Sequence, residues 1–376
     1  MRFFTVLILI FALSLSPAEI YSALDVSAKS AIMIDAETGR ILFEKNAYEK
    51  RSMASTTKII TAITAIEKGN LSDVVVTSEN AATTEGSSVW LEPGEKLTLS
   101  ELLYAVLLES GNDASVAVAE HIGGSVEAFS SMMNATCKNA GADSTNCVTP
   151  SGLDAELHYT TAYDMAKIAA YAMKSDVFRE IVATQKATIP WEGKEWDRTL
   201  VNHNKLLNMY DGADGIKTGY TKKSGRCLVS SAEKNGFRVI VVTLDAPDDW
   251  NDHIKLFDYA FTTYTEDIVL LSEGVPLGDV KVDGTKDEYA KFGAEETVTI
   301  KKSGQDESDI RLKLSENLKA PLYSGEIVGT AEIFLNNSYY KTVNLILLSD
   351  VEKNSFNYIL KENFTKLLKV LLYSMR

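Results

Sequence analysis

The distribution of apolar residues between residues 30 and 261 follows two periods. Short apolar runs typical of strands alternate with apolar residues at the three- and four-residue spacing of helices. Residues 30–45 predict a hairpin, because the turn residues Glu37-Thr38-Gly39 separate two apolar runs. We further expect helices over residues 56–67, 99–119 and 161–172, and strands over residues 227–231 and 238–244. Such a mixture predicts an α/β (α+β) fold built around an antiparallel sheet.

The pattern changes after about residue 265. Short alternating segments with Gly and Asp between them predict strands at residues 280–282, 296–301, 310–314 and 328–348. From about residue 352, apolar residues recur at helical steps between Phe356 and Leu372 and form one stripe. We therefore predict three parts: a mixed domain over residues 24–265, a small all-β domain over 266–348 and an amphipathic helix over 349–376.

The N-terminus indicates export from the cytoplasm. Residues 3–16 form an apolar run of 14 residues after Met1-Arg2. That run is shorter than the roughly 20 residues needed to span a bilayer, and it is followed by small residues. We interpret residues 1–23 as a signal peptide cleaved after Ala18 or Ala23, rather than as a buried N-terminal helix.

Composition excludes several classes of protein. The chain has 38 Lys and Arg against 52 Asp and Glu, a net charge of −14, which argues against a nucleic-acid partner. Apolar residues make up 45%, so the chain is not broadly disordered. The four histidines and three cysteines show no spacing typical of a zinc site, and we expect neither a metal nor another cofactor.

Ser55 and Lys58 are the first candidates for chemistry. They lie three residues apart where the predicted helix begins, so their side chains share one face. A serine nucleophile needs a base within hydrogen-bond reach, and a lysine serves if burial or a nearby cation keeps it neutral. The helix N-terminus also directs N–H groups at a developing oxyanion. By itself, the pair is also explained by an N-cap serine and a solvated lysine.

Two other polar groups interrupt the apolar pattern. Ser110-Gly111-Asn112 breaks the helix expected over residues 99–119, where a hydroxyl and an amide could reach into a cleft. Lys217-Thr218-Gly219, followed by Tyr220, supplies a cation, a hydroxyl and a glycine that lets a ligand approach the strand backbone. Taken singly, a helix terminator and a hairpin rim explain these segments as well.

The order of the three motifs is more informative than any one of them. S-x-x-K at 55–58, S-x-N at 110–112 and K-T-G at 217–219 follow one another as in the penicillin-recognising serine enzymes. The chain resembles the D-alanyl-D-alanine carboxypeptidases, the low-molecular-mass penicillin-binding proteins. Further segments similar to that family are residues 30–62, 102–124, 149–169 and 206–232. The resemblance implies a serine β-lactamase/transpeptidase-like catalytic domain, followed by a small β domain and a terminal amphipathic helix.

The resemblance also implies catalytic roles. Ser55 would be the acylated nucleophile and Lys58 its base. Ser110 would relay a proton to the leaving D-alanine, and Lys217 would help to keep Lys58 neutral. The backbone N–H groups of Ser55 and Tyr220 would form the oxyanion hole, and water would release the shortened peptide. The implied substrate is the peptidoglycan stem peptide, and β-lactams would act as inhibitors.

Binding roles follow for the remaining matched residues, with one departure from the family. Asn112 would bind the substrate amide, and Thr218 would help to hold the terminal carboxylate. Lys217, Gly219 and Tyr220 complete the set of substrate-binding residues that the resemblance implies. Members of the family often carry an arginine shortly after the strand that follows K-T-G, but residues 245–253 contain none. The carboxylate would then depend on Lys217 and Thr218, or on an arginine elsewhere.

The sequence also bears on four alternative functions. A class A β-lactamase would have S-D-N in place of Ser110-Gly111-Asn112 and would lack the two C-terminal parts. A catalytically inactive module that only binds peptidoglycan stems would not need all the polar residues of the three motifs, which are intact here. A D,D-endopeptidase would use the same residues and stays open. A Ser-His-Asp hydrolase is disfavoured because no G-x-S-x-G occurs.

The terminal segment and the cysteines complete the expectations. Residues 353–376 carry five basic residues against the single acid Glu362, so the predicted helix suits an anionic membrane surface rather than a bilayer span. A helix docked on protein is the alternative. Cys137 and Cys147 could close a disulfide in an exported protein or remain two buried thiols, and Cys227 would then be free.

Overall fold

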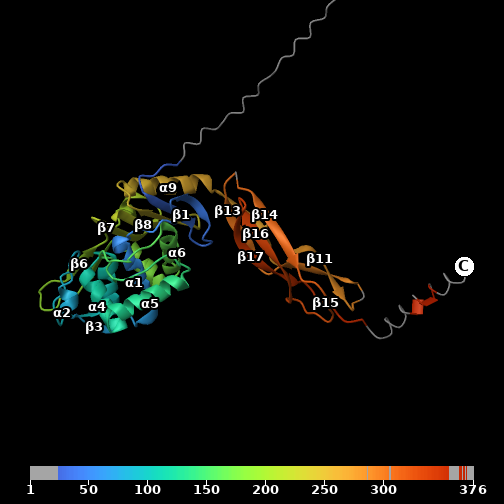
Figure 1. Cartoon of the computed structure of the whole chain (residues 1–376), viewed down its shortest axis with the longest axis horizontal. Coiled ribbons are helices and arrows are strands. Elements are labelled where there is room, and N and C mark those ends of the chain that lie inside the picture. Colours follow the sequence, from blue (N-terminus) through green and yellow to red (C-terminus); the bar gives the residue numbers. More distant parts are fainter. Residues whose placement is uncertain are drawn as a thin grey trace, which may run out of the picture. The chain divides into compact units, whose positions relative to one another are not determined.

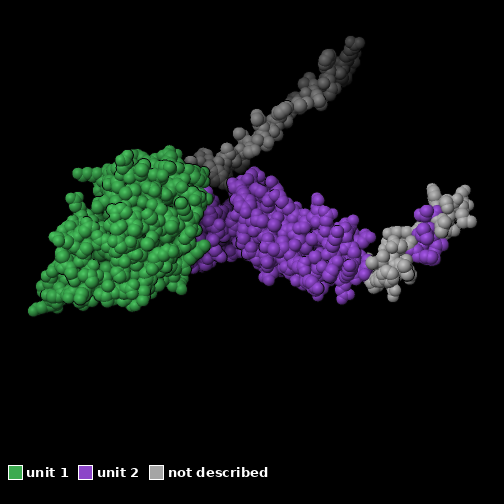
Figure 2. All heavy atoms as spheres, turned by 60° about the horizontal axis from the view of Figure 1, so that its bottom comes forward, with its two compact units in different colours: residues 1–34, 43–232, 240–256 green, residues 35–42, 233–239, 257–376 purple. Residues whose placement is uncertain are grey.

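The computed structural model describes residues 24–285, 287–304, 306–354, 364–365, 367–368 and 370 (Figure 1). The predicted signal peptide and most of the predicted terminal helix lie outside these residues. The chain divides into two compact units, one of residues 1–34, 43–232 and 240–256, the other of residues 35–42, 233–239 and 257–376 (Figure 2). Within the described ranges, no helix is long and apolar enough to cross a membrane.

A five-stranded sheet with the order β2-β1-β9-β8-β7 supports the first unit. Its strands are β1 (Ser30–Asp35), β2 (Ile41–Lys45), β7 (Ala213–Thr221), β8 (Gly225–Lys234) and β9 (Phe237–Leu244). All six residues of β1 are buried, which is expected for a central strand covered on both faces. β7 ends the sheet and pairs antiparallel with β8, so among the described residues no further strand pairs with its other edge. The predicted antiparallel sheet is confirmed.

Helices cover both faces of this sheet (Figure 1). The helices are α1 (Lys58–Lys68), α2 (Glu79–Ala82), α3 (Leu99–Leu107), α4 (Asn112–Gly123), α5 (Val126–Asn139), α6 (Ala162–Ala172), α7 (Asp176–Ala183), α8 (Leu206–Met209) and α9 (Asp249–Thr263). α9 packs on one face, where His253 contacts Ser230 of β8 and Thr243 of β9. Short strand pairs join β3 (Val74–Val76) to β4 (Lys96–Thr98) and β5 (Lys186–Ile189) to β6 (Arg198–Val201).

The helix expected over residues 99–119 is broken where the sequence predicts. A capping box between Thr98 and Glu101 starts α3, because each side chain satisfies a backbone N–H of the other residue. α3 ends at Leu107 and α4 begins at Asn112. Ser110 has φ of 63°, a left-handed conformation that a continuous helix does not permit.

The second unit contains the predicted β domain. A six-stranded sheet has the order β14-β16-β17-β12-β11-β15, and β10 pairs with β13. The strands are β10 (Glu266–Leu271), β11 (Pro276–Asp283), β12 (Tyr289–Ala294), β13 (Val298–Lys302), β14 (Ser308–Leu314), β15 (Leu318–Lys319), β16 (Ile327–Leu335) and β17 (Ser338–Leu347). The run at 328–348 is thus a hairpin that turns at Asn336-Asn337, both with positive φ. Alternate residues of β16, such as Ala331 and Ile333, enter the apolar core.

Candidate active site

Ser55 lies in the 3₁₀ turn Ala54–Thr57 that leads directly into α1. Lys58 is the first residue of α1, and its Nζ lies 3.1 Å from Ser55 Oγ. The serine and the lysine predicted to share one face therefore meet. The Lys58 side chain is fully buried, whereas Ser55 borders a cavity.

The Lys58 amine donates hydrogen bonds to two acceptors in addition to its contact with Ser55. Its Nζ donates to Asn112 Oδ1 at 2.7 Å and to the carbonyl oxygen of Ser151 at 2.6 Å. The orientation of the Asn112 amide is set by its own Nδ2, which donates to the carbonyl of Glu85 at 2.6 Å. A neutral amine has two N–H donors and one lone pair, so these two acceptors leave the lone pair for Ser55 Oγ–H. The geometry suits a lysine that accepts the serine proton.

The electrostatic surroundings favour the same neutral form. Burial is the largest influence on Lys58 and holds its pKa well below the ordinary value; the positive charge of Lys217 acts in the same direction, and Asp113 opposes it. Burial also lowers the pKa of Lys217 to about 7, against the influence of Glu109. Burial and the charge of Lys217 thus both disfavour a proton on Lys58, which allows a lysine to act as a base near neutral pH.

The second and third motifs reach the same place from other elements. Ser110 lies between α3 and α4 and lines the cavity, and the backbone N–H of Asn112 donates to the carbonyl of Ser87 at 2.7 Å. Lys217, Thr218 and Gly219 lie on the edge strand β7, where Lys217 is buried and donates to the carbonyl of Thr218 at 3.1 Å. The fold therefore brings together residues separated by more than 160 positions in the sequence.

Gly219 is packed directly against the turn that carries Ser55. A Cβ at Gly219 would lie 2.9 Å from the backbone nitrogen of Ser55, 3.0 Å from that of Thr56 and 3.1 Å from Ala54 Cβ. Only glycine allows β7 to approach the turn this closely. The turn that carries Ser55 and the Gly219 segment of β7 therefore lie side by side at the cavity.

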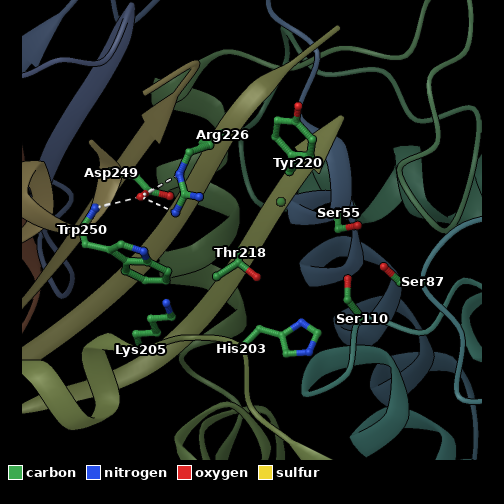
Figure 3. Close-up of a pocket in the computed structure, with 11 residues that line it drawn as sticks. Ser55, Ser87, Ser110, His203, Lys205, Thr218, Tyr220, Arg226, Asp249 and Trp250 are labelled. Atoms are coloured by element: carbon green, nitrogen blue, oxygen red, sulfur yellow. Dashed lines mark hydrogen bonds and ion pairs between the residues drawn. The ribbon is translucent and has the colours of Figure 1, made fainter. Parts of the chain in front are cut away.

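The cavity has a volume of about 380 Å³, a size typical of small-ligand sites. Its lining includes five of the predicted residues: Ser55, Ser110, Thr218, Gly219 and Tyr220. The other three predicted residues, Lys58, Asn112 and Lys217, are buried behind it. Figure 3 shows the three serines 55, 87 and 110 on one side of the cavity, Arg226, Asp249 and Trp250 on the other, and Thr218 between them.

Six residues that line the cavity were not predicted from the sequence. They are Ser87, His203, Lys205, Arg226, Asp249 and Trp250. Asp249 lies inside the stretch 245–253, which contains no arginine, and it accepts hydrogen bonds from Arg226 on β8. The register of β7 and β8 places Arg226 opposite Tyr220, so recognising the hairpin turn at 222–224 would have pointed to it.

A buried histidine supports the turn before Ser55. Ala54 has φ of 47°, unusual for a residue with a side chain. The carbonyl of Ala54 accepts from Thr57 Oγ1 at 2.7 Å, and Thr57 Oγ1 lies 2.8 Å from His158 Nε2. Because His158 Nδ1 accepts from the backbone of Val148 at 2.9 Å, its Nε2–H donates to Thr57. Burial lowers the pKa of His158 to about 4, which keeps this neutral tautomer.

Potential metal ligands and cysteines are the other groups that could carry chemistry. Among the described residues, no cluster of three His, Cys, Asp or Glu side chains could hold a metal ion. Cys137, Cys147 and Cys227 are buried free thiols, and the Sγ atoms of Cys137 and Cys147 lie 4.0 Å apart.

The amino-acid sequence is similar to one protein family along most of its length. Residues 17–248 match the family model described as D-alanyl-D-alanine carboxypeptidase, and residues 266–353 match the C-terminal domain of penicillin-binding protein 5. The chain is 37% identical to D-alanyl-D-alanine carboxypeptidase DacF of Bacillus subtilis, over 90% of each chain. It is 33% identical to D-alanyl-D-alanine carboxypeptidase DacC of Escherichia coli, over 88% of this chain and 86% of that one.

Solved structures have the same architecture. The structure of penicillin-binding protein 5 from Haemophilus influenzae superposes with a TM-score of 0.72 at 28% identity, over 88% of this chain and 98% of that one. A peptidoglycan synthesis regulatory factor (PBP3) from Streptococcus pneumoniae superposes with a TM-score of 0.70 at 28% identity, over 87% of this chain and all of that chain.

Proposed function

The chain belongs to the D-alanyl-D-alanine carboxypeptidase family, and we propose that Ser55, with Lys58 as its base, carries out that reaction here. The protein is a serine-type D-Ala-D-Ala carboxypeptidase that acts on peptidoglycan stem peptides and is acylated by β-lactams. The observation that carries the assignment of Ser55 is the amine of Lys58, whose two N–H donors are engaged by Asn112 and Ser151 while Ser55 Oγ lies 3.1 Å away.

Acylation follows from this geometry. Ser55 Oγ gives its proton to the lone pair of Lys58 and forms a bond to the carbonyl carbon of the penultimate D-alanine. The negative charge that develops on the carbonyl oxygen is stabilised by the backbone N–H groups of Ser55 and Tyr220. The bond to the nitrogen of the terminal D-alanine then breaks, and Ser110 relays to this nitrogen the proton that Lys58 took from Ser55, which leaves Lys58 neutral again.

Deacylation reverses the same proton path with water as the nucleophile. Lys58 takes a proton from water, the hydroxide attacks the ester carbonyl, and the Ser55 hydroxyl is restored as the shortened peptide leaves. Asn112 and the rim of β7, including Gly219, hold the substrate backbone, while Lys217 and Thr218 face its terminal carboxylate. Lys217 has a second effect, because its charge disfavours protonation of Lys58.

Penicillin labelling tests the assignment of Ser55. Intact-mass measurement after incubation with penicillin should show one penicilloyl adduct on the wild-type chain and none on Ser55→Ala. Peptide mapping should place the adduct on Ser55. A label on Ser110, or an adduct on Ser55→Ala, would overturn the assignment.

We also propose an extracytoplasmic location for a chain with three parts after the signal peptide 1–23: a catalytic domain over 24–265, a β domain over 266–348 and a membrane-binding helix over 349–376. Support for the helix comes from its five basic residues and its apolar stripe. Among the few described residues of this segment, Phe364, Leu367, Leu368 and Val370 are helical and exposed.

Liposome sedimentation tests the proposed anchor. The mature chain should pellet with vesicles that contain anionic lipid, whereas a chain ending at Ser349 should stay in the supernatant and still bind penicillin. Equal partition of both chains would contradict the anchor. Loss of penicillin binding in the shorter chain would instead assign the segment a role in folding.

A further inference from the structure

We propose that Asp113 is a positioning residue whose buried carboxylate fastens one wall of the cavity, residues 85–91, to the S-x-N motif. By fastening the wall, Asp113 holds Asn112 against Lys58. The inference rests on the proposed function of Ser55, because Asp113 acts on acylation through other residues and does not line the cavity. The motif ends at Asn112, and Asp113 follows it as the second residue of α4.

The carboxylate of Asp113 is held by N–H and O–H donors. The residue is 0% exposed. Its Oδ2 accepts hydrogen bonds from Ser88 Oγ at 2.6 Å and from the backbone N–H groups of Val89 and Leu91, both at 3.1 Å. Its Oδ1 accepts from the backbone N–H of Ala114 at 2.8 Å. A buried charge is tolerated only where hydrogen bonds replace its hydration, so the carboxylate is committed to this loop.

The wall has no helix or strand of its own to hold its shape. Residues 84–92 are irregular, and Val89 and Leu91 are each only 4% exposed, so their N–H groups need acceptors inside the protein. Trp90 lies between them with φ of 61°, a left-handed conformation. Backbone N–H groups that converge in this way form a nest for an anion. In this wall the anion is the side chain of Asp113.

The preceding half of the wall is attached to Asn112. The backbone N–H of Asn112 donates to the carbonyl of Ser87 at 2.7 Å, and its Nδ2 donates to the carbonyl of Glu85 at 2.6 Å. A Cβ at Gly86 would lie 2.5 Å from Asn112 Nδ2, so the backbone packs directly on the amide. Ser87 lines the cavity on the side that carries Ser55 (Figure 3). Two consecutive residues of α4 therefore hold consecutive parts of one wall.

The same amide links the wall to the catalytic base. Asn112 Oδ1 accepts from Lys58 Nζ at 2.7 Å, so Asn112 is shared between the base and the wall. A nest without its anion would release residues 88–91, and the carbonyls that orient the Asn112 amide would shift with them. Lys58 would then lose one of the two acceptors that leave its lone pair for Ser55.

The first test measures the rate constant of penicillin acylation separately from the fraction of protein that is labelled. Asp113→Asn is nearly isosteric, but it replaces one acceptor oxygen by an NH2 group that faces N–H donors. The acylation rate constant should fall about 10- to 100-fold, the effect of a small misplacement around the base, while the adduct stays on Ser55. Partial unfolding would instead lower the labelled fraction and leave the rate constant of the folded protein unchanged.

Asp164→Asn is the matched control. Asp164 also lies in the first turn of a helix, α6, is 4% exposed and accepts from a loop, the N–H of Ser144 at 2.6 Å and the hydroxyl of Thr145 at 2.9 Å. It does not line the cavity, so this substitution should lower Tm but keep the acylation rate constant within about twofold of wild type. A wild-type rate constant for Asp113→Asn, or equal losses in both variants, would overturn the proposal.

The pH dependence of acylation distinguishes positioning from a general loosening of the site. Burial is the largest influence that lowers the pKa of Lys58, the charge of Lys217 adds to it, and the charge of Asp113 opposes both. Glu109 acts in turn on Lys217. Asp113→Asn removes the opposing charge, so the pKa of Lys58 should fall further and the acid limb of the profile should move to lower pH. A loosened site would admit water, raise that pKa and move the limb to higher pH, which would contradict the proposal.

Ser88→Ala decides the question if Asp113→Asn does not fold. It deletes the hydrogen bond to the carboxylate and the one from the N–H of Trp90, but leaves the charge of Asp113 in place. The acylation rate constant should fall about 3- to 10-fold without a shift of the acid limb, and an unchanged rate constant would refute the proposal. A wild-type protein that forms no penicilloyl adduct at Ser55 would refute the proposed function itself. Normal wild-type acylation with unaffected variants would refute only the positioning role.

Discussion

Gly219→Ala should damage catalysis and stability together. The added Cβ would lie 2.9 Å from the backbone nitrogen of Ser55, about half an ångström inside ordinary contact, and 3.0 Å from that of Thr56. Neither neighbour is a flexible side chain, and the turn is held by Thr57, whose hydroxyl donates to the carbonyl of Ala54. β7 must therefore move away from the turn, which widens the gap between the N–H groups of Ser55 and Tyr220.

The expected size of each effect follows from that displacement. A forced shift in a packed site costs about 1–3 kcal/mol. For a domain of this size that corresponds to a fall in Tm of roughly 2–12 °C. A misplacement of about half an ångström at an oxyanion hole should lower the penicillin acylation rate constant about 10- to 100-fold. Stopped-flow acylation and thermal unfolding, measured on the same preparations, give the two numbers.

The matched control is Gly304→Ala in the β domain. A Cβ at Gly304 would have no atom within 4 Å, and its φ is not left-handed, so both rate and Tm should stay at wild-type values. A Gly219→Ala enzyme that is acylated at the wild-type rate would show that the contact between β7 and the turn does not set the oxyanion geometry. A fall in Tm without a fall in rate would lead to the same conclusion.

Three further predictions follow from buried groups. Lys58→Arg should lose penicillin acylation nearly as completely as Lys58→Ala, because a guanidinium keeps its proton; a near-wild-type rate would contradict the role of Lys58 as base. The free energy of unfolding should fall as pH drops from about 6.5 to about 4, because the unfolded chain takes up a proton on His158 before the folded chain does; denaturant titrations should show a weaker fall for His158→Ala. Alkylation of the unfolded, unreduced protein should modify all three cysteines, since the Sγ atoms of Cys137 and Cys147 lie 4.0 Å apart and a disulfide needs about 2.05 Å; fewer modified thiols before reduction than after it would reveal a bond.

Local signals account for the features that could be predicted. The helix break at Ser110, the hairpin at residues 30–45 and the strands of the β domain each follow from residue types that are adjacent or nearly adjacent in the sequence. Ser55 and Lys58 are three residues apart, so helical geometry alone predicts that they can meet. The sheet order β2-β1-β9-β8-β7 has no comparable local signal, because it depends on pairing between strands about 200 residues apart.

The surroundings of Lys58 illustrate what no local pattern contains. One of its acceptors is the backbone carbonyl of Ser151, and every residue carries such a group, so no residue type marks the position. The neutral state of Lys58 depends first on burial, which is a property of the whole fold. The motif predicts which residue is the base, but the burial that lowers its pKa can be seen only in the folded structure.

Arg226 marks a different limit of motif comparison. A motif specifies residue types at fixed spacings, whereas the lining of a cavity depends on which residues the fold brings together. Arg226 on β8 and a residue at the start of α9 can reach the same cavity wall, because the pairing of Arg226 with Tyr220 brings that end of the strand beside Asp249. Asp249, at the start of α9, accepts two hydrogen bonds from the Arg226 guanidinium. Arg226 and Asp249 are 23 positions apart on different elements, so no local spacing predicts the pair. Asp249→Asn weakens this partly buried ion pair and should therefore lower the melting temperature, which thermal unfolding would measure; an unchanged value would show that the pair does not stabilise the junction of β8 and α9.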